Sequence, residues 1–293
     1  MTLQDGCGST LDAMAIIARS HSTFLGIARK ASPLSTDLPP VSQAGQLTDS
    51  GDFGLGIYLA LIGITLINGG TIVFPRTREP SLSTALAIFA KRPVPGQVKT
   101  RLTPALSPEA AAGLYWAMVE DTWARASELP NVDLHLFVDQ PWEGFDALAN
   151  GRPVLLQTGD DLGTRMLFCL QLLTTAYLNP TIIIGSDSPT LPAGHIQGAF
   201  ALLQNDDNAV LGPAEDGGYY LVGCRRTHPE MFRGVAWSAD QTLAQTRAAF
   251  AAQGYQTHLT PMWRDVDVIE DVRRLAKEPV GPSVQAWLRQ NPL

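Results

Sequence analysis

Apolar and polar residues alternate in blocks through the last two thirds of the chain. Short apolar runs such as 85–90 (ALAIFA) and 181–184 (TIII) have the composition of buried strands. Longer stretches between such runs have helical spacing, as where Leu114, Met118 and Thr122 recur at intervals of about one helical turn. We therefore predict strands that alternate with helices.

The expected elements follow one another in a regular order. The predicted strands cover 85–90, 132–138, 153–157, 181–184, 209–211, 219–222 and 256–259. The predicted helices cover 108–128, a stretch after Asp160, 193–203, 239–253 and a last helix from about residue 270. This alternation is typical of an α/β protein with a mainly parallel sheet and helices on both faces, a three-layer α/β/α sandwich. Because such sheets bind ligands at the carboxyl ends of their strands, the loops after the strands are the places to search for chemistry.

The beginning of the chain does not share this order. Residues 1–52 mix Gly, Ser, Thr, Pro and small apolar residues without a steady period, so we expect a poorly structured N-terminal extension. Residues 53–74 then contain no charged side chain. As a helix, this segment would be about long enough to cross a bilayer core.

Three interpretations of residues 53–74 stay open: a single-pass membrane anchor, a buried segment of a globular domain, or part of a non-native leader caused by an upstream start codon. As an anchor, it has Asp49 and Asp52 before it and Arg76 and Arg78 after it, which would leave the rest of the chain in the cytoplasm. No positively charged region opens the chain, which argues against a cleaved secretory signal. We expect a cytoplasmic protein, with a membrane-anchored cytoplasmic domain as the alternative.

Composition and charge narrow the possible classes of protein further. The 293 residues are 45% hydrophobic and 17% charged, enough for one large core or two modest ones. The net charge of −7 argues against a general nucleic-acid or anionic-membrane surface, although it permits a local basic pocket. Cys7, Cys169 and Cys224 are odd in number and far apart, so neither a disulfide framework nor a paired-thiol metal site is expected.

The loop after the first predicted strand is strongly basic. Lys91, Arg92, Lys99 and Arg101 stand around Pro and Gly residues and could surround a diphosphate. A solvated basic loop would have the same composition. The loop lacks the glycine spacing of a P-loop or a dinucleotide fingerprint, so we do not expect a Rossmann NAD site.

Later loops contribute carboxylates. Asp187 directly follows a β-branched strand, where its oxygens could bind a hard divalent cation or form an Asx turn. Residues 212–220 place Glu215 and Asp216 beside two glycines and two tyrosines, which suits the close approach of a ligand and equally suits a tight turn. Asp267 precedes the last helix, as an N-cap or as a metal ligand.

In the motifs of these loops and in their order, the chain resembles the DUF2064 family of the glycosyltransferase-A superfamily. This family is related to MobA-like and CofC-like nucleotidyltransferases. The matching phrases are FAKRPVPGQVKTRL (89–102), GDDLGTRM (159–166), IGSDSPTLP (184–192), GPAEDGGYYLVG (212–223), FRGVAWS (232–238) and DVDVIEDV (265–272). The resemblance implies a nucleotide-diphospho-sugar transferase fold and a catalytic domain over 84–277. We expect a tail with a short helix over 278–293.

The resemblance also implies roles for individual residues. Asp187 and Asp267 would bind Mg²⁺ or Mn²⁺. The residues implied for phosphate binding are Lys91, Lys99, Arg101 and Arg165. The residues implied for the substrate pocket are Gly217, Gly218, Tyr219 and Trp237. An inverting transfer needs a carboxylate base, for which Asp216 is the first choice and Glu215 the second.

The implied function is metal-dependent transfer of a sugar from a nucleotide sugar to a small-molecule acceptor. The alternative is a nucleotidyltransferase that takes a nucleoside triphosphate and releases pyrophosphate, and a third possibility is a non-catalytic nucleotide-binding module. The sequence Pro-Val-Pro-Gly at 93–96, where nucleotidyltransferases usually have a glycine-rich loop, favours sugar transfer. No nucleic-acid partner is expected, and membrane contact is expected only through 53–74.

Overall fold

The computed structural model describes residues 65–67, 71–73, 84–177 and 179–292. The extension predicted for 1–52 lies outside these residues, as does most of 53–74. Within that segment, β1 (Thr65–Ile67) and β2 (Thr71–Val73) form an antiparallel pair. None of the helices described is both long and apolar enough to span a membrane.

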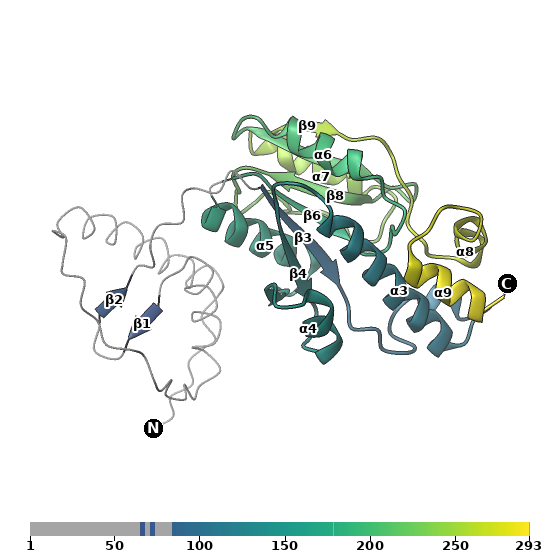
Figure 1. Cartoon of the computed structure of the whole chain (residues 1–293). Coiled ribbons are helices and arrows are strands. Elements are labelled where there is room, and N and C mark those ends of the chain that lie inside the picture. The colour runs from purple at the N-terminus through teal and green to yellow at the C-terminus, as the bar shows by residue number, and fades with distance from the viewer. Residues whose placement is uncertain (1–64, 68–70, 74–83, 178, 293) are drawn as a thin grey trace, which may run out of the picture. The chain divides into compact units, whose positions relative to one another are not determined.

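Seven strands form one sheet in the order β5-β4-β3-β6-β8-β7-β9 (Figure 1). Their bounds are β3 (Thr84–Ala90), β4 (Val132–Val138), β5 (Val154–Leu156), β6 (Thr181–Gly185), β7 (Asn208–Pro213), β8 (Tyr219–Cys224) and β9 (Gln256–Leu259). Strands β5, β4, β3 and β6 are mutually parallel, and β9 is parallel to β7. Strand β8 is antiparallel to both of its neighbours. The mainly parallel sheet predicted from the sequence is confirmed.

Helices cover both faces of this sheet and define two hydrophobic cores. The first core includes α3 (Pro108–Ser127), α4 (Glu143–Ala149), α6 (Ala193–Leu202), α8 (Ile269–Leu275) and α9 (Pro282–Gln290). The second core includes α5 (Leu162–Tyr177) and α7 (Thr242–Ala252). A short 3₁₀ helix, η1, spans Thr100–Leu102. The three-layer α/β/α architecture is confirmed, whereas α4 and η1 were not predicted.

Strand β3 is an inner strand of the sheet, and its sequence is apolar on both faces. In β3, Leu86, Ile88 and Ala90 belong to the first core, and Ala85 and Ala87 belong to the second. All five are at most 1% exposed. Successive side chains of a strand point to opposite faces, so a strand covered on both faces is apolar at every position.

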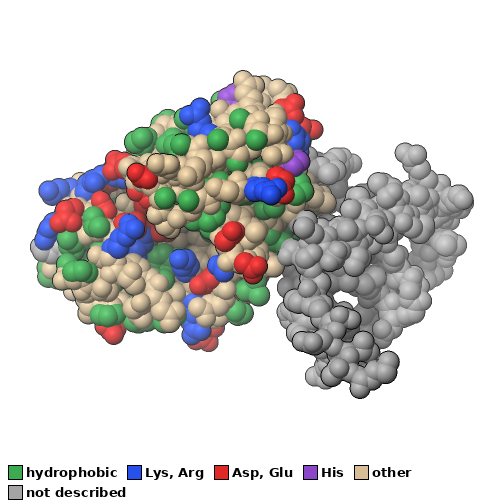
Figure 2. Space-filling model, turned by 180° about the vertical axis from the view of Figure 1, so that it is seen from behind, with side chains coloured by type: hydrophobic (Ala, Val, Ile, Leu, Met, Phe, Trp, Pro, Cys, Tyr) green, Lys and Arg blue, Asp and Glu red, His purple; other side chains and the backbone are tan. Residues whose placement is uncertain are grey.

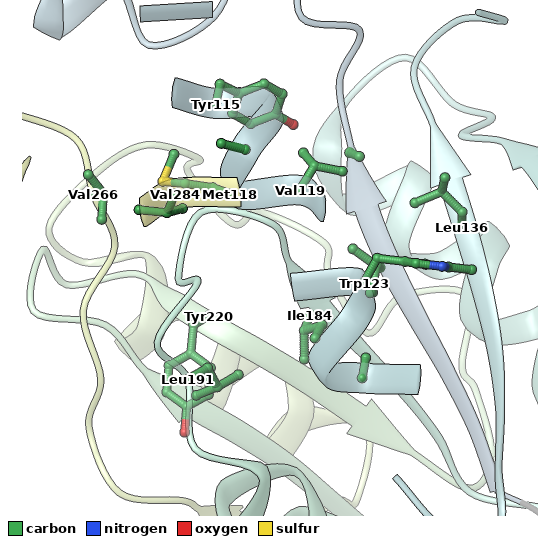
Figure 3. Close-up of a cluster of buried hydrophobic side chains, with 14 of the residues drawn as sticks. Tyr115, Met118, Val119, Trp123, Leu136, Ile184, Leu191, Tyr220, Val266 and Val284 are labelled. Carbon is green, nitrogen blue, oxygen red and sulfur yellow. The ribbon is translucent and has the colours of Figure 1, made fainter. Parts of the chain in front are cut away.

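Helix α3 begins where the local signals predict. The hydroxyl of Ser107 accepts a hydrogen bond from the N–H of Ala110 at 3.1 Å, and Pro108 occupies the first helical position. Figure 3 shows the buried face of this helix, with Met118, Val119 and Trp123 among the labelled side chains of the first core. The capping signal and the helical spacing therefore identify this helix from sequence alone.

A buried histidine is expected to make the fold sensitive to acid. Burial lowers the pKa of His135 in β4 to about 4, with smaller effects of Asp133, which raises it, and Arg152, which lowers it. Above pH 6.5 the imidazole is neutral in both the folded and the unfolded chain. As the pH falls from about 6.5 to 4, the unfolded chain binds a proton that the folded chain excludes, so the free energy of unfolding falls by at most about 3 kcal/mol.

Replacing this residue tests the effect. We expect the His135→Gln variant to lose less stability than the wild type between pH 7 and pH 4.5, as measured by urea denaturation followed by circular dichroism. His228→Gln, outside the sheet, controls for the substitution itself. If the free energy of unfolding changed with pH in the same way in His135→Gln and in the wild type, the prediction would be wrong.

Candidate functional site

A cavity of about 410 Å³ opens where β3 and β6 end. The residues that line it are Phe89, Ala90, Lys91, Gln97–Arg101, Tyr115, Gln157, Leu162, Gly185, Asp187, Tyr219, Tyr220, Asp265 and Asp267. Most of them belong to loops that follow strands, as expected for a sheet with parallel neighbours. Six residues of the predicted site are among them: Lys91, Lys99, Arg101, Asp187, Tyr219 and Asp267.

Lys99 lies between two carboxylates at one side of this cavity. Its Nζ donates to Oδ2 of Asp187 at 2.7 Å and to Oδ1 of Asp267 at 2.8 Å. The side chain of Lys99 is 5% exposed, whereas those of Asp187 and Asp267 are 38% and 35% exposed. The two acids thus remain open to the cavity while the ammonium between them is buried.

These three groups stabilise one another's charge. Burial by itself would raise the pKa of Asp187, but the nearby ammonium of Lys99, helped by Lys91 and Ser186, holds it below its usual value. Burial by itself would lower the pKa of Lys99, but Asp187 and Asp267 raise it above its usual value. Lys99 and Asp187 are therefore both charged at neutral pH.

The loop that carries Lys99 is held in an uncommon conformation. Lys99 has a left-handed backbone with φ of 48° and ψ of 41°, which costs a non-glycine residue about 1 kcal/mol. Val98 and Leu102 on either side are buried in the first core. Their packing holds the backbone in place, so the strained residue directs its side chain toward the two acids.

Two further cations line the cavity more loosely. Nη1 of Arg101 lies 3.5 Å from Oδ2 of Asp267, and the Arg101 side chain is 66% exposed. The backbone N–H of Lys91 donates to the hydroxyl of Tyr115 at 2.7 Å, which fixes the end of β3. These cations are better placed than Lys99 to meet a ligand that enters from solvent.

The loop before α8 meets the loop after β6 through the backbone. The N–H of Val266 donates to the carbonyl of Asp187 at 3.1 Å. Asp271 accepts from the N–H groups of Asp267 and Val268 through one carboxylate oxygen, at 3.0 and 2.9 Å. These bonds hold Asp267 beside Asp187 although the two residues lie far apart in sequence.

Asp265 is an acid of the cavity that the sequence analysis did not assign. Its Oδ1 accepts a hydrogen bond from the hydroxyl of Ser188 at 2.5 Å. Burial raises its pKa to about 6, and the charge of Asp187 adds to the effect. The alternation in Asp-Val-Asp was the available signal, because it places Val266 in the core and both acids on the opposite side of an extended chain.

Gln157 and Tyr115 are the other unassigned polar residues of the lining. Nε2 of Gln157 donates to the carbonyls of Ala90 and Phe137 at 3.1 and 2.9 Å. Two carbonyls require a donor, so the amide nitrogen must face them and the amide oxygen faces elsewhere. The hydroxyl of Tyr115 is also 3.0 Å from that of Ser186. Gln157 directly follows β5, whereas the sequence analysis placed it inside the predicted strand 153–157.

The two carboxylates proposed as a base lie outside the cavity lining. Oδ1 of Asp216 accepts the N–H of Gly218 at 2.9 Å within the exposed turn between β7 and β8. Oε2 of Glu215 lies 3.2 Å from Nη1 of Arg274. The structure therefore does not bring Asp216 or Glu215 to the group formed by Lys99 and its two acids.

The remaining predicted residues have mainly local roles. Gly217 has a φ of 87°, and a Cβ there would overlap the carbonyl of Asp240, so the turn requires glycine. Nε of Arg165 donates to the carbonyl of Gly159 at 2.9 Å, and Arg165 is not part of the lining.

Trp237 also lies outside the lining and packs beside the start of α5. A Cβ on Gly163 would be 2.6 Å from its ring. Tyr219 lines the cavity and also packs against the second core. Of the four residues implied for the substrate pocket, Tyr219 alone contributes to this cavity.

The described part of the chain contains no cluster of three or more His, Cys, Asp or Glu side chains that could hold a metal ion. Asp187 and Asp267 do point two oxygens at a single cationic position. Two carboxylates fit Mg²⁺ or Mn²⁺ when substrate phosphates and water provide the other ligands, which is the usual arrangement in nucleotide enzymes. The donor set thus fits a metal ion that arrives with a phosphate ligand.

Charge is mixed elsewhere on the surface. Figure 2 shows Lys and Arg side chains beside Asp and Glu side chains across the visible face of the described residues. The described residues include several exposed ion pairs, such as Arg225 with Asp206 and Arg226 with Asp207. This view gives no support for an extended basic surface.

Comparisons with known proteins agree with this architecture. A family model described as "Uncharacterized protein conserved in bacteria (DUF2064)" matches residues 122–239. A crystal structure from Desulfovibrio desulfuricans G20, of a protein described as a proposed nucleotide-diphospho-sugar transferase, is 33% identical. It covers 71% of this chain and 94% of its own, with a TM-score of 0.65. The protein therefore has the nucleotide-diphospho-sugar transferase fold and belongs to the DUF2064 family, as the resemblance predicted.

Other solved structures are more distant. A cytidylyltransferase from Leptospira borgpetersenii serovar Hardjo-bovis is 12% identical, covers 72% of this chain and 95% of its own, and has a TM-score of 0.44. A 4-diphosphocytidyl-2C-methyl-D-erythritol synthase from Anaerococcus prevotii DSM 20548 is 10% identical, covers 71% and 96%, and has a TM-score of 0.46. No curated protein matches the chain significantly.

Proposed function

We propose that this protein is a transferase that moves a sugar from a nucleotide sugar to a small-molecule acceptor. The observation that carries the proposal is the cavity where β3 and β6 end, with Lys91, Lys99 and Arg101 beside Asp187 and Asp267. Its volume of about 410 Å³ suits a small organic ligand. The 33% identical relative described as a proposed nucleotide-diphospho-sugar transferase supports the same class.

The cations of the cavity would stabilise the nucleoside diphosphate as it leaves the sugar. When a sugar leaves a nucleotide diphosphate, negative charge develops on the β-phosphate, and positioned cations stabilise that charge in a site partly shielded from water. Arg101 offers a forked donor from the rim, and Lys91 a point charge from the end of β3. These side chains would also hold the donor in a reactive orientation.

A divalent ion would be held by Asp187 and Asp267. When bound, Mg²⁺ or Mn²⁺ supplies positive charge that neutralises the phosphates of the donor. The contribution of the chain itself is the pair of carboxylates, each of which accepts a hydrogen bond from Lys99 in this structure.

The acceptor must lose a proton in a sugar transfer. An inverting reaction needs a carboxylate within hydrogen-bond reach of the acceptor hydroxyl. Asp216 and Glu215 lie in the exposed turn after β7, so they would serve only an acceptor that extends from the cavity to this turn. If Asp216 or Glu215 is the base, the acceptor binds toward the outside of the site.

The same observation favours a second candidate, nucleotidyl transfer. A substrate phosphate that attacks the α-phosphate of a nucleoside triphosphate is already ionised and needs no carboxylate base. The lining contains the cations and acids for that reaction, while Asp216 and Glu215 lie outside it. In this reaction pyrophosphate would be the leaving group.

Product analysis distinguishes the candidates. The purified protein is incubated with Mn²⁺ and with panels of nucleotide sugars and nucleoside triphosphates, each with candidate acceptors, and the released phosphate species are followed. Free nucleoside diphosphate is expected for sugar transfer and pyrophosphate for nucleotidyl transfer. Nucleotide binding without either product would contradict both and would indicate a non-catalytic binding module.

A further inference from the structure

The ammonium of Lys99 lies between Asp187 and Asp267, the two acids that would hold a metal ion. Each acid contributes one oxygen to it, at 2.7 and 2.8 Å. We infer that Lys99 is an internal counter-ion that keeps divalent metal off the free protein and leaves this position when nucleotide phosphates enter. Metal then binds only together with nucleotide, an order that rests on the function proposed above.

Burial supports this role for Lys99. Its side chain is 5% exposed, so the ammonium depends on the two carboxylates in place of water. A divalent ion that entered beside it would meet a positive charge almost in contact. In the free protein, metal must therefore displace the lysine before it can reach both acids.

The local charge balance points the same way. The cavity lining holds three cations, Lys91, Lys99 and Arg101, and three carboxylates, those of Asp187, Asp265 and Asp267, so their charges balance. A divalent ion alone would leave this group with excess positive charge. A nucleotide diphosphate brings several negative charges, which attract both the ammonium and the metal.

The site also allows the exchange. Lys99 is itself a lining residue, so its side chain can turn into the cavity toward phosphate while Val98 and Leu102 keep the backbone in place. Arg101 does not fill the same position: its side chain is 66% exposed, and the acid with which it pairs among the described residues is Asp267, at 3.5 Å. Among the cations of the lining, Lys99 alone has both acids as hydrogen-bond partners.

Titration with Mn²⁺, followed by electron paramagnetic resonance, tests the inference without measuring turnover. For the wild type without nucleotide we expect weak binding, and at least tenfold tighter binding in the presence of a nucleoside diphosphate that the protein binds. Lys99→Met is expected to bind Mn²⁺ at least tenfold more tightly than the wild type without nucleotide. Lys277→Met, at an exposed lysine after α8 and outside the cavity lining, is the matched control, with an affinity within about threefold of the wild type.

A double variant shows where the metal binds. Lys99→Met combined with Asp267→Asn should lose the gain in affinity, since one of the two carboxylates is then neutral. Circular dichroism confirms that each variant is folded. If Lys99→Met does not fold, Lys99→Gln, which also removes the ammonium, takes its place in the same comparison.

The outcomes separate this inference from the proposed function. Equal Mn²⁺ affinity of the wild type with and without a bound nucleotide, or of folded Lys99→Met and wild type, would overturn the role of Lys99 and leave the transferase proposal standing. If no nucleotide binds, the proposed function fails, while the comparison of Lys99→Met with wild type still decides whether Lys99 blocks the metal position.

Discussion

Replacing Asp187 by Asn is expected to lower kcat/KM for transfer by about 10² to 10³-fold, the usual effect of removing one group that stabilises transition-state charge. Asp187 lies two residues after the end of β6, and its side chain is 38% exposed. In the proposed site it is the shared partner of Lys99 and of a bound metal ion. The amide keeps the shape of the side chain and removes its charge. The assay is the release of nucleoside diphosphate or pyrophosphate under the conditions of the product analysis.

The control for this variant lies at the opposite edge of the sheet. Asp206 is exposed, just before the start of β7, and pairs only with Arg225 among the charged side chains described. Asp206→Asn should retain activity within about threefold of the wild type. Wild-type activity in a folded Asp187→Asn protein would show that the chemistry takes place elsewhere.

Replacing Asp121 by Ala is expected to lower the free energy of unfolding by about 3 kcal/mol, since a buried charged acceptor then leaves two donors without a partner. Asp121 lies on α3 and is 3% exposed. Its two oxygens accept the N–H groups of Ser283 and Val284, each at 3.0 Å, at the start of α9. The N-cap residue of α9 is Gly281, which has no side chain to make these bonds.

This contact explains why Gly281 is at the cap. A Cβ on Gly281 would overlap the carboxylate of Asp121, so the glycine admits a cap from another helix. Trp287 strengthens the same docking, because its Nε1 donates to the carbonyl of Ala110 at 3.0 Å. Asp121 thus holds the start of α9 against α3.

Urea denaturation measures the effect. Asp121→Asn should lose part of the stability, because one acceptor oxygen becomes a donor that faces an N–H group. Glu128→Ala, an exposed acid at the end of the same helix, should change stability by no more than about 0.5 kcal/mol. A comparably small change in Asp121→Ala would refute the capping role.

Local signals identified most elements. The start of α3 follows from the capping by Ser107 and the position of Pro108, and the apolar runs give the strands to within about two residues. Helix α4 escaped because it has seven residues and its N-cap is Trp142, which makes no side-chain cap bond. The reversed direction of β8 had a signal that was not used, because the connection from Pro213 to Tyr219 is too short for a parallel crossover.

Loops after parallel strands meet at one edge of a sheet, so the sequence could place Lys91, Lys99, Asp187 and Asp267 together. The sequence could not predict which of these side chains would pair with one another. Lys99 contacts acids 88 and 168 residues away, and the backbone bond between Val266 and Asp187 brings the last loop into position. The sequence around each residue gives no information about its contacts with residues so far away in the chain.

By itself, the sequence determined the alternation of strands and helices, the residue types of the candidate site and the resemblance to DUF2064, because these depend on local spacing and composition. Only the tertiary structure decided which of those residues share a cavity. It placed Lys99 between two acids, added Asp265 and Gln157, and left Asp216 and Glu215 in an exposed turn. The physical reason is that burial and contact distance are set by packing between segments that are far apart in the chain.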